Sequence, residues 1–389
     1  MTAAKMEHRE RVLAALTHQE PDTVPLDLSS AAGDFVTAIA YSRLLDHLKL
    51  GRRPIKILRR MMQYATVDED VLRRFDVDLR RVELGPPDGW TDREMPDDRY
   101  EDEWGIVRRR PPGGFYYDLV PEGSPLREAD SIDTLDRCRW PDPSDPGRYR
   151  GLHERARRLR EETDYAVVLY LPCDFFGTSC QLRGWENFYM DLVANPQFAA
   201  ALMDRCLEYF LSVARRGLEE AGQYADVVVC ASDDFGGMNG PLISPATFRN
   251  LVKPRLKRVQ DLFREYTEAK RFMHCDGAIY PFIPDLIEVG VDTLNPIQVS
   301  AAGMGDTKKL KAEFGERLTF WGGIDTHHVL PYGTPDDVRA EVKRRIGDLG
   351  ASGGYVACSV HSIQPDVPPE NVVAMFDAVR DYGRYPVER

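Results

Sequence analysis

The chain has 389 residues, a formal net charge of −12 and a hydrophobic content of 43%. This length suits two average domains or one large α/β barrel. The acidic balance disfavours non-specific binding to nucleic acid and to anionic membrane surfaces, so we expect neither as a partner. Seven cysteines without a CxxC pair fit reduced thiols better than a disulfide framework.

The amino-terminal stretch "MTAAKMEHRERVLAAL" lacks the long apolar core of a secretory signal. No segment of the sequence approaches the roughly 18 uninterrupted apolar residues that a membrane-spanning helix requires. We therefore expect a cytoplasmic protein that neither spans nor binds a membrane.

In chain order, amphipathic spacing first predicts a helix over 9–19. Eight short apolar runs then predict strands, at 23–28, 77–83, 165–172, 225–232, 270–275, 291–298, 317–324 and 353–360. Helical patterns separate the later runs, at 244–266, 279–290, 307–315 and 334–350. Strands that alternate with helices indicate parallel βα units, and eight of them predict an α/β fold that closes as a (β/α)8 TIM barrel.

The stretch 86–150 breaks this alternation, because it is rich in Pro, Asp and Arg. We interpret it as an insertion after the second strand, within a single barrel that spans residues 1–389. An open doubly wound sheet is the competing fold. No Gly-rich GxGxxG turn follows any predicted strand, which disfavours that fold and a bound nucleotide.

Polar side chains follow most of the predicted strands. In a barrel, the carboxyl ends of the strands meet at one face, where the active site lies. We therefore expect one pocket to collect the following residues: Asp174, Ser232, Asp233, Asp234, His274, Asp276, Asn295, Gln298, Asp325, His327 and His361. Within this set, Asp174, Asn295 and Gln298 are candidates for binding substrate, and Asp233, Asp234 and His361 are candidates for catalysis.

His274 and Asp276 alternate along an extended chain, so both side chains point to the same face. With His361 they supply two imidazoles and one carboxylate, a set that suits zinc or iron(II) and leaves positions open for substrate. Other interpretations remain open at this point. His274 could bond a backbone carbonyl, Asp276 could cap the helix that follows, and the Asp233–Asp234 pair could form a turn or share a proton.

Three stretches carry a family resemblance: "DDFGGMNGPLISPATFRNLVKPRLKRV" (233–259), "HCDGAIYPFIPDLIEVGVDTLNPIQ" (274–298) and "HSIQPDVPPEN" (361–371). They resemble the uroporphyrinogen decarboxylase superfamily, and the likeness extends over nearly the whole chain. The resemblance implies a (β/α)8 barrel. It also implies an enzyme, because this superfamily contains cofactor-free decarboxylases and zinc-dependent methyltransferases that act between a corrinoid protein and a thiol.

The haem-pathway decarboxylase itself is a poor match. That enzyme holds its polyanionic substrate partly with arginines in a loop after the first strand, and this chain has Ser30 and Asp34 at those places. The methyltransferase branch holds zinc with a histidine and two cysteines. The matching positions here are His274, Asp276 and His361, so the resemblance implies a metal site in which both thiolates have been replaced.

The resulting expectation is a metal-dependent methyl (one-carbon) transferase that contains zinc or iron(II). A corrinoid partner would be a separate protein, and relatives suggest a homodimer. The alternative is a lyase, most simply a decarboxylase of a small acid that uses His and Asp as acid–base groups. The stretch 86–150 is expected to cover the pocket mouth with aromatic side chains that include Trp104 and Tyr116, and Trp104 is a further candidate for binding substrate.

Overall fold

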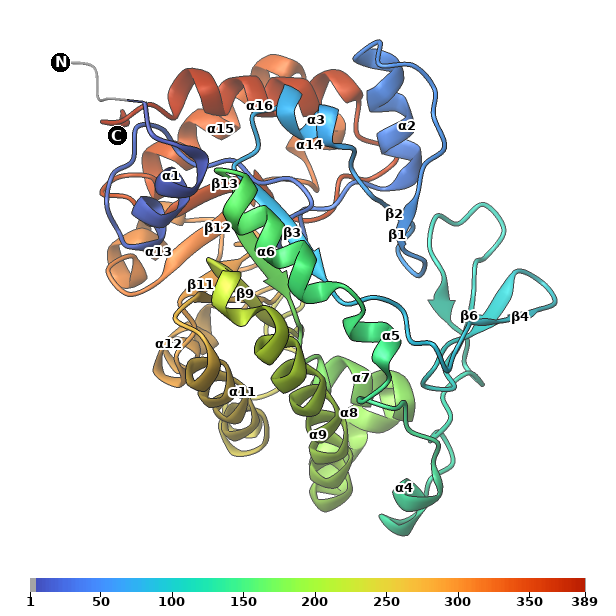
Figure 1. Ribbon diagram of the computed structural model, residues 1–389. Coiled ribbons are helices and arrows are strands. Elements are labelled where there is room, and N and C mark those ends of the chain that lie inside the picture. Colours follow the sequence, from blue (N-terminus) through green and yellow to red (C-terminus); the bar gives the residue numbers. More distant parts are fainter. Residues whose placement is uncertain (1–4, 389) are drawn as a thin grey trace.

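The structure is a computed structural model that describes residues 5–388. Its centre is a curled sheet of seven parallel strands in the order β13-β12-β11-β10-β9-β8-β3 (Figure 1). The strands are β3 (Leu79–Glu83), β8 (Ala166–Tyr170), β9 (Val227–Ser232), β10 (Lys270–His274), β11 (Thr293–Asn295), β12 (Thr319–Ile324) and β13 (Tyr355–Ser359). Seven of the eight predicted strands are therefore confirmed.

The eighth predicted strand, 23–28, is not a regular strand, and the expectation of eight regular strands is corrected in this respect. Leu26 forms a single parallel bridge with Ala357 of β13. The backbone amide of Asp78, just before β3, donates to the carbonyl of Leu26 over 3.0 Å. The segment therefore lies between the two edge strands of the curled sheet and bonds to both sides.

The strands are buried on both faces, as parallel strands are when helices cover the sheet. Along β9, Val227 and Val229 pack into one core inside the curled sheet. Val228 and Cys230 point the other way, into the core shared with the helices. This alternation follows from the two-residue period of a strand, and it explains why the strands read as continuous apolar runs.

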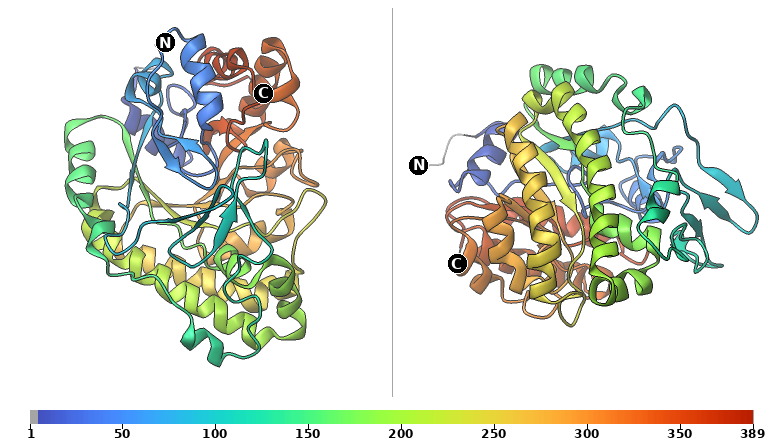
Figure 2. Two further views of the ribbon diagram at one scale, coloured as in Figure 1. Left: turned by 90° about the vertical axis from the view of Figure 1, so that its right-hand side faces the viewer. Right: turned by 90° about the horizontal axis from the view of Figure 1, so that it is seen from below.

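Helices cover the outer face of the sheet (Figures 1 and 2). Those between and after the strands are α6 (Leu152–Glu162), α7 (Phe175–Arg183), α8 (Trp185–Ala194), α9 (Pro196–Ala221), α11 (Lys253–Tyr266), α12 (Ile283–Val289), α13 (Thr307–Phe314), α14 (Val329–Tyr332), α15 (Pro335–Leu349) and α16 (Pro369–Tyr382). The predicted helix 244–266 consists of α10 (Pro245–Thr247), a π-helical turn (Phe248–Val252) and α11. No described helix has the length and apolar character needed to cross a membrane.

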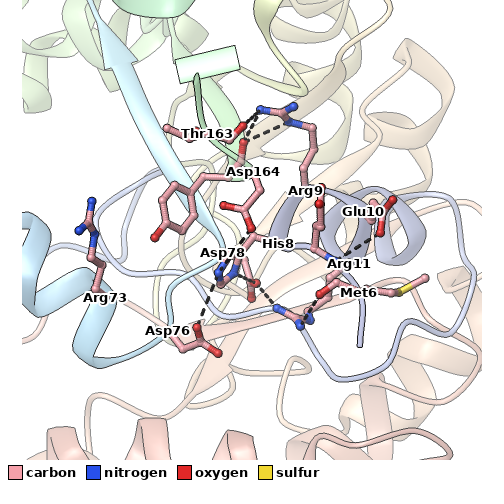
Figure 3. A network of polar contacts seen from close by, with 12 residues as sticks. Met6, His8, Arg9, Glu10, Arg11, Arg73, Asp76, Asp78, Thr163 and Asp164 are labelled. Carbon is pink, nitrogen blue, oxygen red and sulfur yellow. Dashed lines mark hydrogen bonds and ion pairs between the residues drawn. The ribbon is translucent and has the colours of Figure 1, made fainter. Parts of the chain in front are cut away.

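Helix α1 (His8–Leu16) closes the amino-terminal end of the sheet. Val12 and Leu16 pack into the core inside the curled sheet. His8 Nδ1 lies 2.7 Å and Arg11 Nη1 lies 2.5 Å from the same oxygen of Asp78, just before β3 (Figure 3). This network joins α1 to the sheet at the end opposite to the carboxyl ends of the strands.

Residues 86–150 form no part of the parallel sheet. They contain an antiparallel sheet of β4 (Arg93–Met95), β5 (Arg99–Glu101), β6 (Val107–Arg109) and β7 (Asp118–Leu119), followed by α4 (Asp133–Arg137) and α5 (Pro146–Tyr149). This region lies at one side of the molecule (Figure 2). It contacts the hairpin of β1 (Ile57–Arg59) and β2 (Tyr64–Ala65), where the Tyr117 amide donates to the carbonyl of Met61 over 2.9 Å.

Two further helices, α2 (Ala38–His47) and α3 (Glu69–Arg74), flank the β1–β2 hairpin in the sequence. The remaining short 3-10 turns are Gly222–Tyr224 and Tyr280–Phe282.

Candidate metal centre and active site

Three neighbouring strands bring polar side chains into one row. In the parallel register, His274 at the end of β10 pairs with Ser232 of β9 on one side and with Asn295 of β11 on the other. Asp234 follows β9 directly and Asp276 follows β10. The predicted convergence of strand ends is therefore present at these positions.

Asn295 fixes the orientation of the buried His274 ring. The Asn295 side-chain amide donates from Nδ2 to the carbonyl of Trp321 over 3.1 Å, which turns its oxygen toward His274. That oxygen lies 2.6 Å from His274 Nδ1, so Nδ1 carries the proton and donates it. The second ring nitrogen, Nε2, then faces Asp276 Oδ2 at 3.3 Å.

Asp276 lies between two imidazoles. Its Oδ2 is 3.3 Å from Nε2 of His274 and 3.6 Å from Nε2 of His361. Its other oxygen, Oδ1, is buried and has no hydrogen-bond partner among the described residues. Burial opposes the charge of this carboxylate, but the charge and hydrogen bond of His274, whose own pKa is raised to about 10, outweigh that effect, so the pKa of Asp276 lies below its usual value.

Asp234 completes a possible ligand group. Asp234, His274 and Asp276 each offer one ligand atom, and these atoms all lie within 4.8 Å of one another. Oδ1 of Asp234 also accepts from the backbone amide of Asp276 over 2.8 Å, which holds the two loops together. Burial and the charge of Asp276 raise the pKa of Asp234 to about 6.

These residues fit a divalent cation. Two carboxylates and one imidazole are ligands that zinc and iron(II) accept. His274 donates its Nδ1 proton to an amide oxygen, which is the usual outer contact of a metal-bound histidine. The unpartnered Oδ1 of Asp276 supplies a buried donor atom that a cation would satisfy. The sequence predicts His361 as the third ligand, whereas the group of close ligand atoms in the structure contains Asp234 with His274 and Asp276.

A cavity of about 550 Å³ opens beside this group. Asp276, His361 and Gln298 form part of its wall. Tyr116, from the 86–150 stretch, and Met62, from the β1–β2 hairpin, also line it. Burial lowers the pKa of His361 below its ordinary value, so this imidazole is neutral at physiological pH.

Other predicted site residues have clear structural contacts. Both oxygens of the buried Asp233 accept from backbone amides at the start of α7, from Gly177 over 2.7 Å and from Phe176 over 3.1 Å. Gln298 accepts from the Gly277 amide over 2.7 Å, which fixes the loop that follows Asp276. The half-buried Asp174 has a buried Oδ1 without a partner, and burial raises its pKa to about 7.

Trp104 does not line this cavity. Its ring packs against Trp140 and against Tyr209 and Phe210 of α9. Among the aromatic side chains expected to cover the pocket, Tyr116 is the one that the structure places in the wall.

Comparison with known proteins agrees with this arrangement. Residues 116–382, which include every candidate ligand, match the family model described as uroporphyrinogen decarboxylase (URO-D). The chain belongs to this family. Curated uroporphyrinogen decarboxylases from Pseudomonas aeruginosa and Geobacter sulfurreducens are 26% and 23% identical to it. Each alignment covers 69% of this chain, and 73% and 75% of the respective relatives.

A solved structure shares the fold over almost the full length. A methyltransferase from Methanosarcina mazei superimposes with a TM-score of 0.63 at 20% sequence identity, and the alignment covers 97% of this chain and 99% of that one. At 20% identity, this likeness shows that the present URO-D family member shares the fold of that structure, and it shows the fold alone.

This URO-D family member has no arginine at the loop positions that sequence analysis compared with the decarboxylase. Ser30 is buried and donates to the carbonyl of Leu79 over 3.1 Å. Asp34 is fully buried, so it offers no contact to a substrate in the cavity. Between these residues, Gly33 approaches the site closely. A Cβ at Gly33 would meet His274 Cε1 at 2.7 Å and Asn295 Oδ1 at 3.0 Å.

Proposed function

We propose that this protein is a metal-dependent methyl, or related one-carbon, transferase of the URO-D family. The observation that carries the proposal is the Asp234, His274 and Asp276 group, in which Asn295 orients the His274 ring. The structural likeness to a methyltransferase supports the fold, and the donor atoms support the chemistry.

Asp234, His274 and Asp276 would hold the ion, with His361 close enough to join them or to act beside them. When bound there, zinc or iron(II) would act as a Lewis acid that favours the thiolate form of an acceptor thiol or polarises the methyl donor. Because its pKa is low, His361 is a neutral base at the cavity wall. Its Nε2 can accept the proton that an acceptor thiol releases.

The cavity has room for a small-molecule substrate, and Tyr116 of the 86–150 stretch forms part of its wall. Tyr116 would contact the substrate there, and Gln298 would hold the 277 loop in place. We propose a separate corrinoid protein as the source of the methyl group.

A decarboxylase of a small acid is the second candidate. It is favoured by Asp174, whose pKa of about 7 allows this carboxyl group to carry a proton near neutral pH. In that case His274, whose pKa the charge of Asp276 raises to about 10 against the effect of burial, would act as a proton donor. His361 would do so after it has taken up a proton, because it is neutral in the free protein.

Elemental analysis of protein purified without a His-tag separates the two candidates. We expect about one divalent metal per chain in the wild type and a clear loss in Asp276→Ala and His361→Ala. His328→Ala is the matched control, because His328 is exposed in a loop near the cavity and has no place in the proposed ligand set. The metal-loaded protein should transfer a methyl group to a thiol. Wild-type protein that stays metal-free after incubation with zinc and iron(II), and that releases carbon dioxide from a carboxylic acid, would establish the decarboxylase instead.

A further inference from the structure

Two consecutive arginines on the β1–β2 hairpin point to different surroundings. The Arg60 guanidinium lies 4.0 Å from the ring centre of Tyr100 and pairs with Glu94, both in the antiparallel sheet of the 86–150 stretch. Arg59 instead points toward the parallel sheet. Its Nη2 lies 2.6 Å from Oε2 of Glu83, at the carboxyl end of β3.

Arg59 shares that carboxylate with a second guanidinium. Nε of Arg81 donates to the same Glu83 oxygen over 3.0 Å, and its Nη1 donates to the carbonyl of Ala31 over 2.8 Å. Its Cζ lies 3.6 Å above the ring of Tyr170. Arg81 is thus held on three sides, and its side chain is 8% exposed.

Arg59 keeps free hydrogen-bond donors. Its side chain is 40% exposed. Besides Glu83, its only hydrogen-bond acceptor within residues 5–388 is the carbonyl of Leu58, at 3.2 Å. A guanidinium has five N–H groups, so several have no acceptor in the described part of the chain. Among the described residues, Glu83 is the one carboxylate within 4.0 Å of Arg59. Its single negative charge is shared by the two guanidinium groups of Arg59 and Arg81.

This guanidinium lies at the same end of the sheet as the candidate metal ligands. Tyr170, whose ring centre is 5.4 Å from Arg59 Cζ, ends β8. Asp174 follows four residues later, and the charges of both Arg59 and His274 act on it. Met62 of the same hairpin lines the cavity beside Asp276 and His361. The loop that Arg81 holds at Ala31 also approaches His274 closely at Gly33. The hairpin and the loop around Arg59 therefore both reach the candidate metal centre.

We propose that the free N–H groups of Arg59 bind a carboxylate of the substrate, with Arg81 and Tyr170 holding the subsite in shape. The substrate class is then a small carboxylic acid whose reacting group lies at the candidate metal centre. This inference rests on the proposed function for the position of the reacting group. A guanidinium recognises a carboxylate through paired N–H donors, and Glu83 engages only Nη2 of Arg59. Phosphate fits less well, because the nearby carboxylates Glu83, Asp174 and Asp276 repel a second negative charge more strongly.

The test measures anion binding in chelator-treated, metal-free protein by isothermal titration calorimetry at constant ionic strength. The probes are acetate, succinate and inorganic phosphate. Loss of a charge-assisted pair corresponds to roughly tenfold weaker binding or more, and we expect that loss for succinate in Arg59→Leu. Arg59→Lys keeps the charge but lacks the paired donors, so its affinity for succinate should lie between those of the wild type and Arg59→Leu. Arg60→Leu, one residue away on the same hairpin, should bind as the wild type does.

Five outcomes have distinct meanings. Equal succinate binding by the wild type, Arg59→Leu and Arg59→Lys overturns the subsite, and so does a wild type that binds none of the probes. Arg59-dependent binding that prefers phosphate overturns the carboxylate assignment. Metal analysis of the same preparations, before chelator treatment and after incubation of the chelated protein with zinc or iron(II), separates the two proposals. An Arg59-dependent succinate site in a wild type that never takes up metal leaves the subsite standing and overturns the proposed function. A full metal complement with no effect of the Arg59 substitutions overturns the subsite and leaves the proposed function standing.

Discussion

Nδ1 of His274 donates to Oδ1 of Asn295 across 2.6 Å, and this contact leaves Nε2 of the ring facing the carboxylate of Asp276. The Asn295 side chain cannot rotate to offer its NH2 group instead, because that group donates to the Trp321 carbonyl. One buried amide therefore sets the tautomer and the direction of the candidate ligand. Outer contacts of this kind make a metal-bound imidazole more basic and hold its ring in place.

Asn295→Ala should weaken metal binding by roughly 10- to 100-fold, the usual effect of removing such an outer contact. Competition with a chromophoric chelator measures this affinity. Asn371→Ala is the matched control, because Asn371 is equally buried and donates to the carbonyls of Leu330 and Gly333. Both variants lose a buried amide, but the control should keep its metal affinity. Equal affinities in the two variants would show that Asn295 does not orient a ligand.

Gly33→Ala tests the close approach of the 29–34 loop to the site. An added Cβ would lie 2.7 Å from His274 Cε1, and Gly33 also has a φ of +81°. Gly51→Ala separates the two effects, since Gly51 has a φ of +78° with no atom within 4 Å of the added Cβ. Both variants should lose about 1–2 kcal/mol of unfolding free energy from backbone strain, measured by urea denaturation. Gly33→Ala alone should also lose metal, and retention of full metal would contradict the proposed position of His274.

Much of the fold could be predicted because parallel strands buried on both faces leave a continuous apolar signal. Seven strands carry that signal and are confirmed. The segment 23–28 carries it as well, but Pro25 has no backbone N–H to donate, and the structure shows a single bridge there, at Leu26. The sequence pattern indicates that the segment 23–28 is buried, but it does not indicate how many hydrogen bonds the segment forms with neighbouring strands.

The site residues that could be predicted from the sequence are those that lie at the end of a strand or directly after it. His274 and Asp276 are both found at the end of β10, on the same face, because the strand period places them there. Arg59 gave no such signal, since the hairpin of 57–65 is short and its residues resemble ordinary charged surface. Only the tertiary pairing with Glu83 reveals its direction.

The stability of the protein should depend on pH through His8. Burial lowers the pKa of His8, but the hydrogen bond and charge of Asp78 outweigh burial, so the folded-state pKa is raised above 6.5. A raised histidine pKa stabilises the fold fully below about pH 6.5, the unfolded value, and this contribution is lost as the pH rises through the folded-state pKa. The contacts involved join α1 to the sheet (Figure 3).

His8→Gln should therefore cost about 1 kcal/mol more at pH 6 than at pH 9, as expected for one partly buried charged hydrogen bond. Urea denaturation of the wild type and the variant at both pH values measures the difference. His153→Gln is a control, because its ring accepts or donates only in exposed contacts, with the Glu220 carbonyl and Tyr224. A cost for His8→Gln that is independent of pH would contradict the raised pKa.

Asp233 and Asp234 are neighbours in sequence but differ in their surroundings, and their alanine variants should differ accordingly. Asp233→Ala removes the acceptor of one buried and one half-buried amide at the start of α7, at Phe176 and Gly177 respectively. It should cost about 2–4 kcal/mol of unfolding free energy, since each buried donor left unpaired costs about 1–3 kcal/mol. Asp234 is exposed as a residue, although its carboxylate is partly shielded from water. Asp234→Ala should therefore cost less than about 1 kcal/mol yet lose metal and activity.

Urea denaturation and elemental analysis of the same two preparations measure both quantities. Asp233→Asn adds a control, because its amide oxygen still accepts one of the two bonds and should recover part of the stability. If Asp234→Ala keeps a full complement of metal while Asp233→Ala loses it without unfolding, the two roles are reversed. The buried carboxylate would then be the ligand, and the bonds to α7 would serve to position it for the ion.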